Sequence, residues 1–236
     1  MEAEHTKEPK EKDSETVHEL VRLPSEPGFT RSVYLLRHGW AVSNEKRLIN
    51  GTPEHSLTEK GRRQVRAARK LIKLYDLSFT HCFVSHWKRA RETAALFLPD
   101  QNFVVDRRLG ETEPGKAALM NFTEFVARYP NFFPIDPDQP FPGGETHRQH
   151  FTRAVDWFRE VTSTTEEGSQ ILAVCHTGTI SCLLQHVCKM GMAGFPVFVP
   201  QHASLTKLVQ VSNELWKIAY FSVAIPEKTA SKNGAI

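Results

Sequence analysis

An unbroken apolar run at residues 33–36 leads directly into Arg37, His38 and Gly39. Four consecutive apolar residues of this kind are typical of a strand that is buried on both faces, as in a parallel sheet. In open α/β sheets the carboxyl ends of the strands form the ligand-binding edge. Gly39 allows the backbone to turn sharply there and to approach a ligand closely. The stretch therefore predicts a buried strand that presents a guanidinium and an imidazole at a binding edge.

Two further predicted strands end in the same way. Residues 81–85 form a short apolar strand that leads to Arg89, and residues 171–175 form a continuous apolar strand that leads to His176. The carboxyl ends of parallel strands lie on one side of a sheet, so two histidines and two arginines are expected to converge. A cluster of cations and imidazoles with few acids suits a phosphoryl group.

Predicted helices alternate with the predicted strands. Apolar residues recur at helical spacing in four segments, and a hairpin signal at 212–214 joins two late strands. This alternation favours an α/β fold, a three-layer α/β/α sandwich with a mainly parallel central sheet. The predicted helices are 62–75, 88–98, 146–161 and 179–189, and the remaining predicted strands are 103–105, 204–211 and 215–221.

The chain is predicted to form one catalytic domain at residues 30–225. Residues 1–29 are rich in Glu, Lys, Ser and Pro, which predicts a mostly disordered tail, with a short strand or docking segment at 20–23 as the alternative. Residues 226–236 are predicted to be a flexible tail. Residues 110–146, rich in Gly and Pro, are predicted to be a loop-rich insertion with one helix at 121–129.

Composition argues against several classes of protein. A net charge of +3 is too small to indicate a nucleic-acid partner, and the arginines of 62–75 are interpreted as a solvated outer face because no aromatic residues interleave with them. No apolar run approaches the length of a membrane span, and residues 1–12 lack the apolar core of a signal peptide. The four scattered cysteines are expected to be free thiols, mostly buried, in a reducing compartment, which predicts a cytoplasmic protein.

Six motifs, in order along residues 33–221, resemble those of the histidine phosphatase superfamily, the group that includes the cofactor-dependent phosphoglycerate mutases. Each motif is weak alone, but six in register are specific. They are Arg37-His38-Gly39 with Asn44 six residues after the histidine, Asn50-Gly51 with Leu-Thr-x-x-Gly at 57–61, Ser-x-x-x-Arg-Ala-x-x-Thr-Ala at 85–94, Leu-x-Glu-x-x-x-Gly at 109–115, Pro-Gly-Gly-Glu at 142–145, and His176 after an apolar strand.

The resemblance implies a role for each matched residue. His38 would be the nucleophile that forms a phosphohistidine, which splits one difficult step into two easier ones. Arg37, Arg89 and His176 would hold the phosphoryl oxygens and offset their charge, with Asn44 assisting.

The resemblance also implies an acid and further phosphate contacts. Glu111 would protonate the leaving alkoxide and then activate water. The backbone amide of Thr177 would be an extra donor, and Asn50 with Gly51 would belong to the substrate-binding and phosphate-binding set.

Other residues compete with these roles or suggest other chemistry. Glu113 is the alternative acid, and Arg91 is interpreted as a helix-surface charge. His147 and His150 lie one helical turn apart, but no third ligand has metal-like spacing, so a solvated helix face is favoured and no metal is expected. Cys175 does not predict a cysteine phosphatase, because residue 181 is Ser where Cys-x₅-Arg requires Arg.

The chain departs from the family pattern at positions close to the predicted nucleophile. Trp40 and Ala41 stand where the family usually has Glu or Gln followed by Thr or Ser, and 116–118 read Lys-Ala-Ala instead of Trp-Glu-Gly. Thr177 replaces a common Gly. Substrate specificity is therefore not carried over from the family.

The predicted function is a metal-independent phosphomonoesterase of the histidine acid type, acting through a phosphohistidine, with no cofactor. The alternatives are a phosphoglycerate mutase-type or sugar-bisphosphate phosphatase activity, and a weakly active member that binds phosphorylated ligands or proteins. The expected partner is a small phosphorylated substrate, with a phosphoprotein as a variant of it; neither nucleic acid nor a membrane is expected, and the oligomeric state is left open.

Overall fold

A computed structural model describes residues 31–132, 136–212 and 214–226 of the 236-residue chain. The predicted N-terminal tail, its alternative strand at 20–23 and nearly all of the predicted C-terminal tail lie outside these ranges. So does residue 213 of the predicted hairpin turn.

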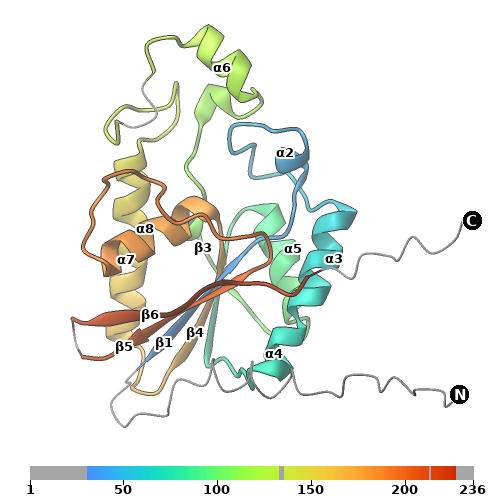
Figure 1. Cartoon of the computed structure of the whole chain (residues 1–236), viewed down its shortest axis with the longest axis vertical. Coiled ribbons are helices and arrows are strands. Elements are labelled where there is room, and N and C mark those ends of the chain that lie inside the picture. Colours follow the sequence, from blue (N-terminus) through green and yellow to red (C-terminus); the bar gives the residue numbers. More distant parts are fainter. Residues whose placement is uncertain (1–30, 133–135, 213, 227–236) are drawn as a thin grey trace, which may run out of the picture.

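The described chain forms a six-stranded sheet in the order β3-β2-β4-β1-β5-β6 (Figure 1). The four strands β1 to β4 are parallel, β5 is antiparallel to β1, and β6 is antiparallel to β5, which confirms the mainly parallel sheet. The strands are β1 (Ser32–Arg37), β2 (His81–Ser85), β3 (Val104–Asp106), β4 (Gln170–Cys175), β5 (Leu205–Gln210) and β6 (Trp216–Val223).

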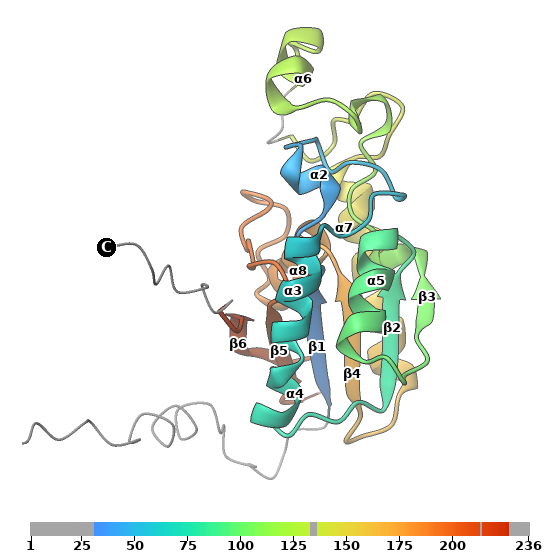
Figure 2. The same cartoon turned by 90° about the vertical axis from the view of Figure 1, so that its right-hand side faces the viewer.

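Helices cover both faces of the sheet (Figure 2). On one face Val33 and Leu35 of β1 pack in a core with α7 (His147–Thr164) and α8 (Thr177–Val187). On the other face Tyr34 and Leu36 pack with the helices that follow β1 and β2. Successive residues of a strand point to opposite faces, so one unbroken apolar strand serves two cores and the three-layer prediction is confirmed. The helices of the second face are α3 (Glu59–Ala68), α4 (Lys70–Leu74) and α5 (Lys88–Phe97).

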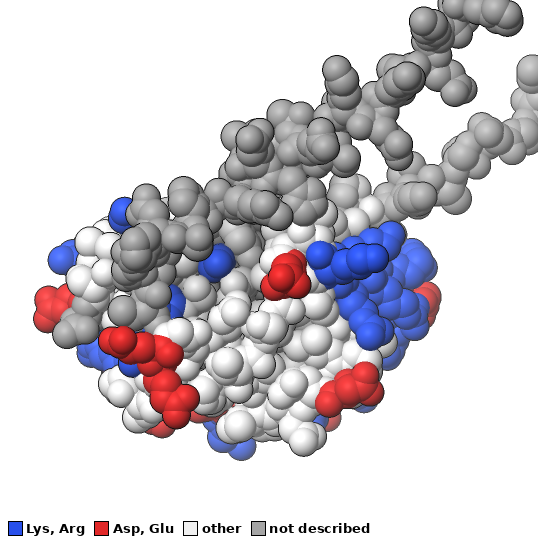
Figure 3. All heavy atoms as spheres, turned by 90° about the horizontal axis from the view of Figure 1, so that it is seen from below, with Lys and Arg blue, Asp and Glu red and all other residues white. Residues whose placement is uncertain are grey.

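The basic helix is amphipathic, as its sequence predicts. Gly61, Val65 and Ala68 of α3 are buried, and the Thr58 side chain caps the helix by accepting from the Gly61 amide. The segment divides into α3 and α4 at residue 69. Its basic side chains form an exposed outer face, visible as blue spheres in Figure 3 on the side where α3 and α4 lie. Arg62 forms an ion pair with Glu92, and Arg66 forms one with Glu59.

The insertion (residues 110–146) has a small core of its own. Ala117, Phe125 and Phe141 are buried there and pack with apolar residues that include Ile49. The short 3-10 helix η1 (Arg107–Leu109) precedes the insertion, which contains the 3-10 helix η2 (Gly115–Ala117) and α6 (Phe122–Arg128), and α6 confirms the predicted helix. The insertion and α2 (Val42–Glu45) stand above the carboxyl edge of the parallel strands in Figure 1.

The described helices and cysteines agree with the composition. Within the described ranges, no helix combines the length and apolarity needed to cross a membrane. Cys82, Cys175 and Cys182 are buried free thiols, and Cys188 is exposed.

Phe97 gives a direct test of the second core. Its side chain is fully buried between α5 and the sheet, so Phe97→Ala should lower the free energy of unfolding by about 3–5 kcal/mol. Val105→Ala is the control: Val105 of the edge strand β3 is 54% exposed, so this change should alter the free energy of unfolding by less than about 0.5 kcal/mol. Urea unfolding of both variants measures the difference, and equal losses would contradict this description of the core.

Candidate active site

The carboxyl ends of β1, β2 and β4 bring the predicted residues together. Arg37, the last residue of β1, pairs with Cys175, the last residue of β4, and the next amide along, that of His38, donates to the Cys175 carbonyl over 3.0 Å. The rings of His38 and His176 lie 5.0 Å apart between centroids. The convergence expected from a parallel sheet is therefore present.

His38 is buried, and its two ring nitrogens have different partners. Nδ1 lies 2.7 Å from the carbonyl oxygen of Gly39, which can only accept, so Nδ1 carries the proton. Nε2 then holds a lone pair, and it accepts from Nε of Arg89 over 3.1 Å. Burial first, and then the charge of Arg89, hold the pKa of His38 well below 6.5. The imidazole is thus neutral at pH 7, with Nε2 as its nucleophilic atom.

Arg89 is a buried cation that contacts two further groups besides Nε2 of His38. It follows β2 on α5, its guanidinium lies 4.2 Å from the Trp87 ring, and Nη1 donates to the Thr52 carbonyl over 3.3 Å. Burial lowers its pKa to about 9, so it stays charged at pH 7. Arg91, by contrast, is exposed, as the sequence predicts for a helix-surface charge.

Arg37 is the second cation at this edge. Its Nη1 donates to the Pro200 carbonyl, and its Nη2 lies 2.8 Å from Nε2 of His202. Burial lowers the pKa of Arg37 to about 10, which leaves it charged at pH 7. Two guanidinium groups beside a neutral nucleophile create a strong preference for an anionic ligand.

His176 is fully buried at the N-cap of α8. Its Nε2 lies 2.8 Å from Oγ of Ser85, and Ser85 Oγ already accepts from the Trp87 amide. The Ser85 hydroxyl can donate its proton to His176 Nε2, and in that tautomer the ring proton of His176 is on Nδ1. Nδ1 is buried without a hydrogen-bond partner in the described structure. His176 thus has a donor to offer to a phosphoryl oxygen.

Glu111, rather than Glu113, lies at the site. Its carboxylate accepts from the Thr112 amide over 3.0 Å and from the Gly178 amide, in the first turn of α8, over 3.1 Å. Its charge acts on both Arg37 and Arg89. Glu113 is exposed. The geometry therefore favours Glu111 for the acid role.

His150 corrects the sequence interpretation. The prediction that His147 and His150 form a solvated face is wrong for His150, which is fully buried, and His147 is half-buried. His150 Nδ1 lies 2.7 Å from Thr112 Oγ1, and Nε2 lies 3.1 Å from Thr179 Oγ1. The helical spacing could have indicated this burial, because His150 lies four residues before Ala154 and therefore on the apolar face of α7. Its hydroxyl partners are two residues that only the fold brings near it.

The remaining predicted residues lie around this edge. Asn44 Oδ1 accepts from the Ala41 amide over 3.0 Å, so this atom caps the α2 turn. Asn50 Nδ2 donates to the Thr112 carbonyl over 2.9 Å, and Gly51 adopts a φ of +73° that favours glycine. Thr177 begins α8, and its hydroxyl is buried without a partner in the described structure. Their contacts with phosphate stay predictions.

The departures from the family pattern occupy the wall beside the nucleophile. The Trp40 ring lies 4.8 Å from the ring of His202 and 4.4 Å from Nζ of Lys60, and Ala41 is fully buried. His202, which the sequence analysis did not single out, lies 5.7 Å from the His38 ring. Burial, followed by the charge of Arg37, lowers its pKa to about 3, so it is neutral at pH 7.

This arrangement suits transfer of a phosphoryl group. A neutral imidazole nitrogen, two guanidinium groups, a second buried histidine and a carboxylate lie together at this edge of the sheet. These are the groups that in-line transfer from an ester to nitrogen requires. No group of three His, Cys, Asp or Glu side chains that could share a metal ion occurs in the described part of the chain.

Residues 33–223 match the histidine phosphatase superfamily (branch 1). The match covers most of the chain and the whole sheet, and the chain belongs to this superfamily, which confirms the resemblance drawn from the six motifs.

Among curated relatives, a 2,3-bisphosphoglycerate-dependent phosphoglycerate mutase from Methylobacterium sp. (strain 4-46) is 30% identical over 164 residues, 65% of this chain and 79% of that one. The human 6-phosphofructo-2-kinase/fructose-2,6-bisphosphatase 1 is 29% identical over 178 residues, 73% of this chain and 35% of that one. The chain thus matches about a third of that longer protein.

Solved structures share the fold. A mycobacterial glucosyl-3-phosphoglycerate phosphatase, solved with VO3, has a TM-score of 0.72 at 23% identity and covers 82% of this chain and 100% of its own. A protein from Escherichia coli described as a putative alpha-ribazole-5'-P phosphatase has a TM-score of 0.73 at 20% identity, covering 84% and 100%. These similarities confirm the phosphoglycerate mutase-like fold.

Gly178 tests the position of the acid. A Cβ at residue 178 would lie 2.1 Å from Oε1 of Glu111, so Gly178→Ala should destabilise the protein by about 1–3 kcal/mol. The same substitution should cost measurably less in a Glu111→Ala background, because the clash with the carboxylate is removed. Urea unfolding of the four proteins gives this coupling. Equal costs in both backgrounds would contradict the described contact.

The buried histidines predict a pH dependence of stability. Burial is the largest cause that holds the pKa values of His38, His150 and His176 well below 6.5. Below pH 6.5 the unfolded chain binds protons that the native protein does not, so the free energy of unfolding falls as the pH is lowered. The slope approaches about 1.4 kcal/mol per pH unit for each histidine, and this effect is absent well above pH 6.5. Denaturant unfolding at pH 7.5, 6.5 and 5.5 measures it, and a constant value would refute the neutral imidazoles.

Proposed function

We propose that this protein is a metal-independent phosphomonoesterase that acts through a phosphohistidine at His38, a phosphatase of the histidine acid type. The observation that carries the proposal is the pair of hydrogen bonds of His38. Gly39 fixes the proton on Nδ1, and Arg89 meets the lone pair of Nε2, where a phosphoryl group would be attacked. Family membership supports the same reaction class.

The first step transfers the phosphoryl group to the protein. Arg89 transfers its Nε–H hydrogen bond from Nε2 of His38 to a phosphoryl oxygen, the freed lone pair of Nε2 attacks phosphorus, the N–P bond forms, and the bond to the leaving oxygen breaks. Glu111, protonated in the complex, gives its proton to that oxygen, so a neutral alcohol leaves. Arg37, Arg89 and Nδ1–H of His176 stabilise the oxygens of the phosphoryl group.

The second step returns the free enzyme. Glu111, now ionised, takes a proton from a water molecule whose oxygen attacks phosphorus. The N–P bond breaks, inorganic phosphate leaves, and Glu111 is protonated again as in the first step. The amides of Thr112 and Gly178 hold the carboxylate in place through both steps. No metal and no organic cofactor takes part, and the expected partner is a phosphorylated molecule.

A mutase is the second candidate, because one relative at 30% identity is a phosphoglycerate mutase. A mutase must keep its phosphoenzyme from water and return the phosphoryl group to a second oxygen of the substrate. The two candidates share His38 and differ in the acceptor, so release of inorganic phosphate separates them.

The test is hydrolysis of p-nitrophenyl phosphate in the presence of a chelator. Wild type should release inorganic phosphate, and His38→Ala should lose activity by more than about 10³. The same reaction, stopped with base, should show an alkali-stable phosphorylated histidine in wild type alone. A wild type no more active than His38→Ala would refute the enzyme and leave the phospho-ligand-binding module.

Glu111→Gln tests the assignment of the acid. With p-nitrophenyl phosphate, whose leaving group needs little protonation, phosphohistidine formation should be nearly unchanged. With an alkyl phosphate it should fall by about 10²–10⁴, because the alkoxide needs a proton. Glu113→Gln is the matched control and should behave as wild type with both substrates. The opposite pattern would assign the acid to Glu113.

A further inference from the structure

We propose that the substrate is a phosphate monoester whose alcohol carries an uncharged, apolar ring, and that this ring occupies a cavity beside Glu111. The inference rests on the proposed phosphatase function and adds the substrate class to it. It depends on where the cavity lies, what lines it and which charges it lacks.

The cavity touches the acid and not the nucleophile. It has a volume of about 320 Å³, and Glu111, Thr112, Thr177 and Gly178 form the side next to the catalytic edge. Because the acid protonates the leaving oxygen, the body of the leaving alcohol must extend from that oxygen past Glu111. The cavity is thus placed to receive the leaving group.

Apolar side chains from three separate segments form most of the remaining lining, together with Asn50 and His147. The loop after α2 contributes Leu48 and Ile49, the insertion contributes three phenylalanines, and the chain after α8 contributes Phe195 and Pro196. Phe122, Phe125 and Phe141 are these three phenylalanines, and a fourth phenylalanine of the insertion, Phe132, also lines the cavity. A cavity of this size with such walls suits one ring rather than a long chain.

The aromatic side chains are arranged for contact with a ring. Phe132 lies 4.9 Å from Phe141 and 5.0 Å from Phe125, and His147 lies 4.9 Å from Phe195. Such centroid distances are those of edge-to-face and offset aromatic pairs, which leave ring edges and faces to meet a further ring. Burial of a ring among these side chains would supply binding energy at the leaving-group side.

The cavity lacks a partner for a second anionic group. Among the described residues that line it there is no lysine or arginine, and the one acidic residue is Glu111. His147 is the remaining titratable group, and burial lowers its pKa. A carboxylate or a second phosphate on the leaving alcohol would therefore be desolvated without a cation. Phosphoglycerates and sugar bisphosphates fit this cavity poorly.

The experiment compares three phosphate esters of alkyl alcohols, so that the leaving oxygens have similar intrinsic reactivity. Benzyl phosphate carries an apolar ring, glycerol 3-phosphate is polar and uncharged beyond its phosphate, and 3-phosphoglycerate carries a second anion. We expect kcat/KM to be at least tenfold higher for benzyl phosphate than for either of the others. A phosphotyrosine peptide and free phenyl phosphate, which share one leaving-group chemistry, form a second pair that tells a protein source from a small molecule.

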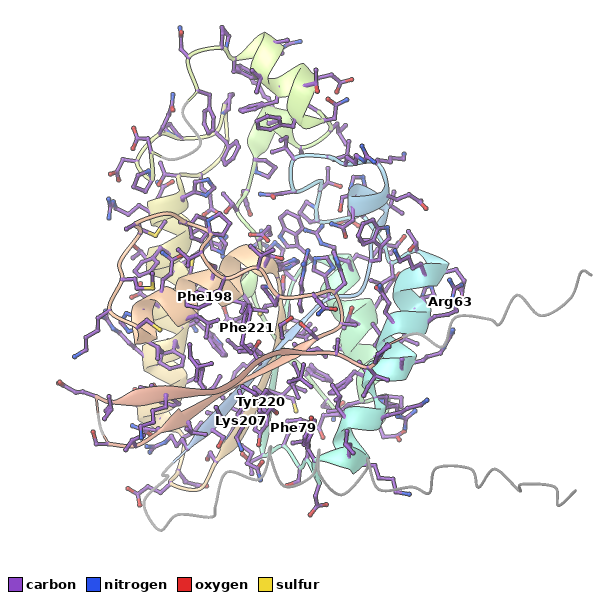
Figure 4. The ribbon with its side chains drawn as sticks, in the orientation of Figure 1. Arg63, Phe79, Phe198, Lys207, Tyr220 and Phe221 are labelled. Atoms are coloured by element: carbon purple, nitrogen blue, oxygen red, sulfur yellow. The ribbon has the colours of Figure 1, made fainter. Side chains whose placement is uncertain are left out.

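A cation at the rim should change this preference. Phe122 lines the cavity yet is 61% exposed, so Phe122→Lys should leave the fold intact. We expect it to lower kcat/KM for benzyl phosphate by at least threefold and to raise it for 3-phosphoglycerate. Phe221→Lys is the matched control, since Phe221 is 39% exposed on β6 and packs on Phe198, at the level of the sheet in Figure 4 and outside the cavity lining. It should change neither value.

The outcomes separate the two proposals. A preference for benzyl phosphate that Phe122→Lys reduces and Phe221→Lys leaves unchanged supports the ring site. Faster turnover of 3-phosphoglycerate or glycerol 3-phosphate than of benzyl phosphate, with activity still dependent on His38, would overturn the ring site and leave the phosphatase function standing. Absence of His38-dependent hydrolysis for every ester would overturn the phosphatase function itself.

Discussion

The contact between Arg89 and His38 is the interaction on which the catalytic edge depends. A buried guanidinium donates to the one nitrogen that must remain unprotonated, and it keeps the pKa of His38 low. The contact requires that the carbonyl of Gly39 accepts the N–H of Nδ1, so that Nε2 keeps its lone pair. It also requires the hydroxyl of Thr93, which accepts from the Gly39 amide and donates to the Arg89 carbonyl, because these two bonds connect the end of β1 to α5. A nucleophile, its tautomer and its nearest cation are thus fixed by a single hydrogen-bonded unit that spans two strand ends.

Close backbone approaches make this unit possible. A Cβ at Gly39 would lie 2.6 Å from the Gly61 carbonyl, and a Cβ at Gly61 would lie 2.0 Å from the Trp40 carbonyl. The turn after β1 therefore packs directly on the first turn of α3, with no side chain between them. On the other side of the site, the absence of a side chain at Gly178 lets the carboxylate of Glu111 contact the backbone in the first turn of α8. Backbone groups therefore approach the site directly on two of its sides.

The sequence was sufficient for the parts that depend on local pattern. Unbroken apolar runs identified β1, β2 and β4, and the polar residues at their ends identified His38, Arg89 and His176, because a parallel sheet leaves little freedom in where strand ends lie. The sequence was insufficient where the burial and hydrogen bonds of a side chain depend on residues far away along the chain. From the sequence, His150 is interpreted as a surface residue, but in the fold it contacts the hydroxyls of Thr112 and Thr179. His202 has no distinguishing sequence pattern, but in the fold it contacts Arg37. The Leu-x-Glu motif favours Glu111 over Glu113, and the burial of Glu111 with its hydrogen bonds to two backbone amides supports that choice.

In the two proposals, the groups that act on phosphorus and most groups that meet the leaving alcohol come from different parts of this molecule, and Glu111 belongs to both sets. The groups that act on phosphorus stand on the sheet edge and on the helices that begin there, so any change to them alters the reaction itself. The groups proposed to meet the leaving alcohol stand on the loop after α2, on the insertion and on the chain after α8. Phe195 packs against the core of the sheet, while most of those of the first two segments belong to a small core of the insertion. Substitutions in that core can exchange an apolar wall for a cation without disturbing His38 or Arg89. A fold with this division can change its substrates while it keeps one mechanism. In this chain the aromatic lining would set the substrate class.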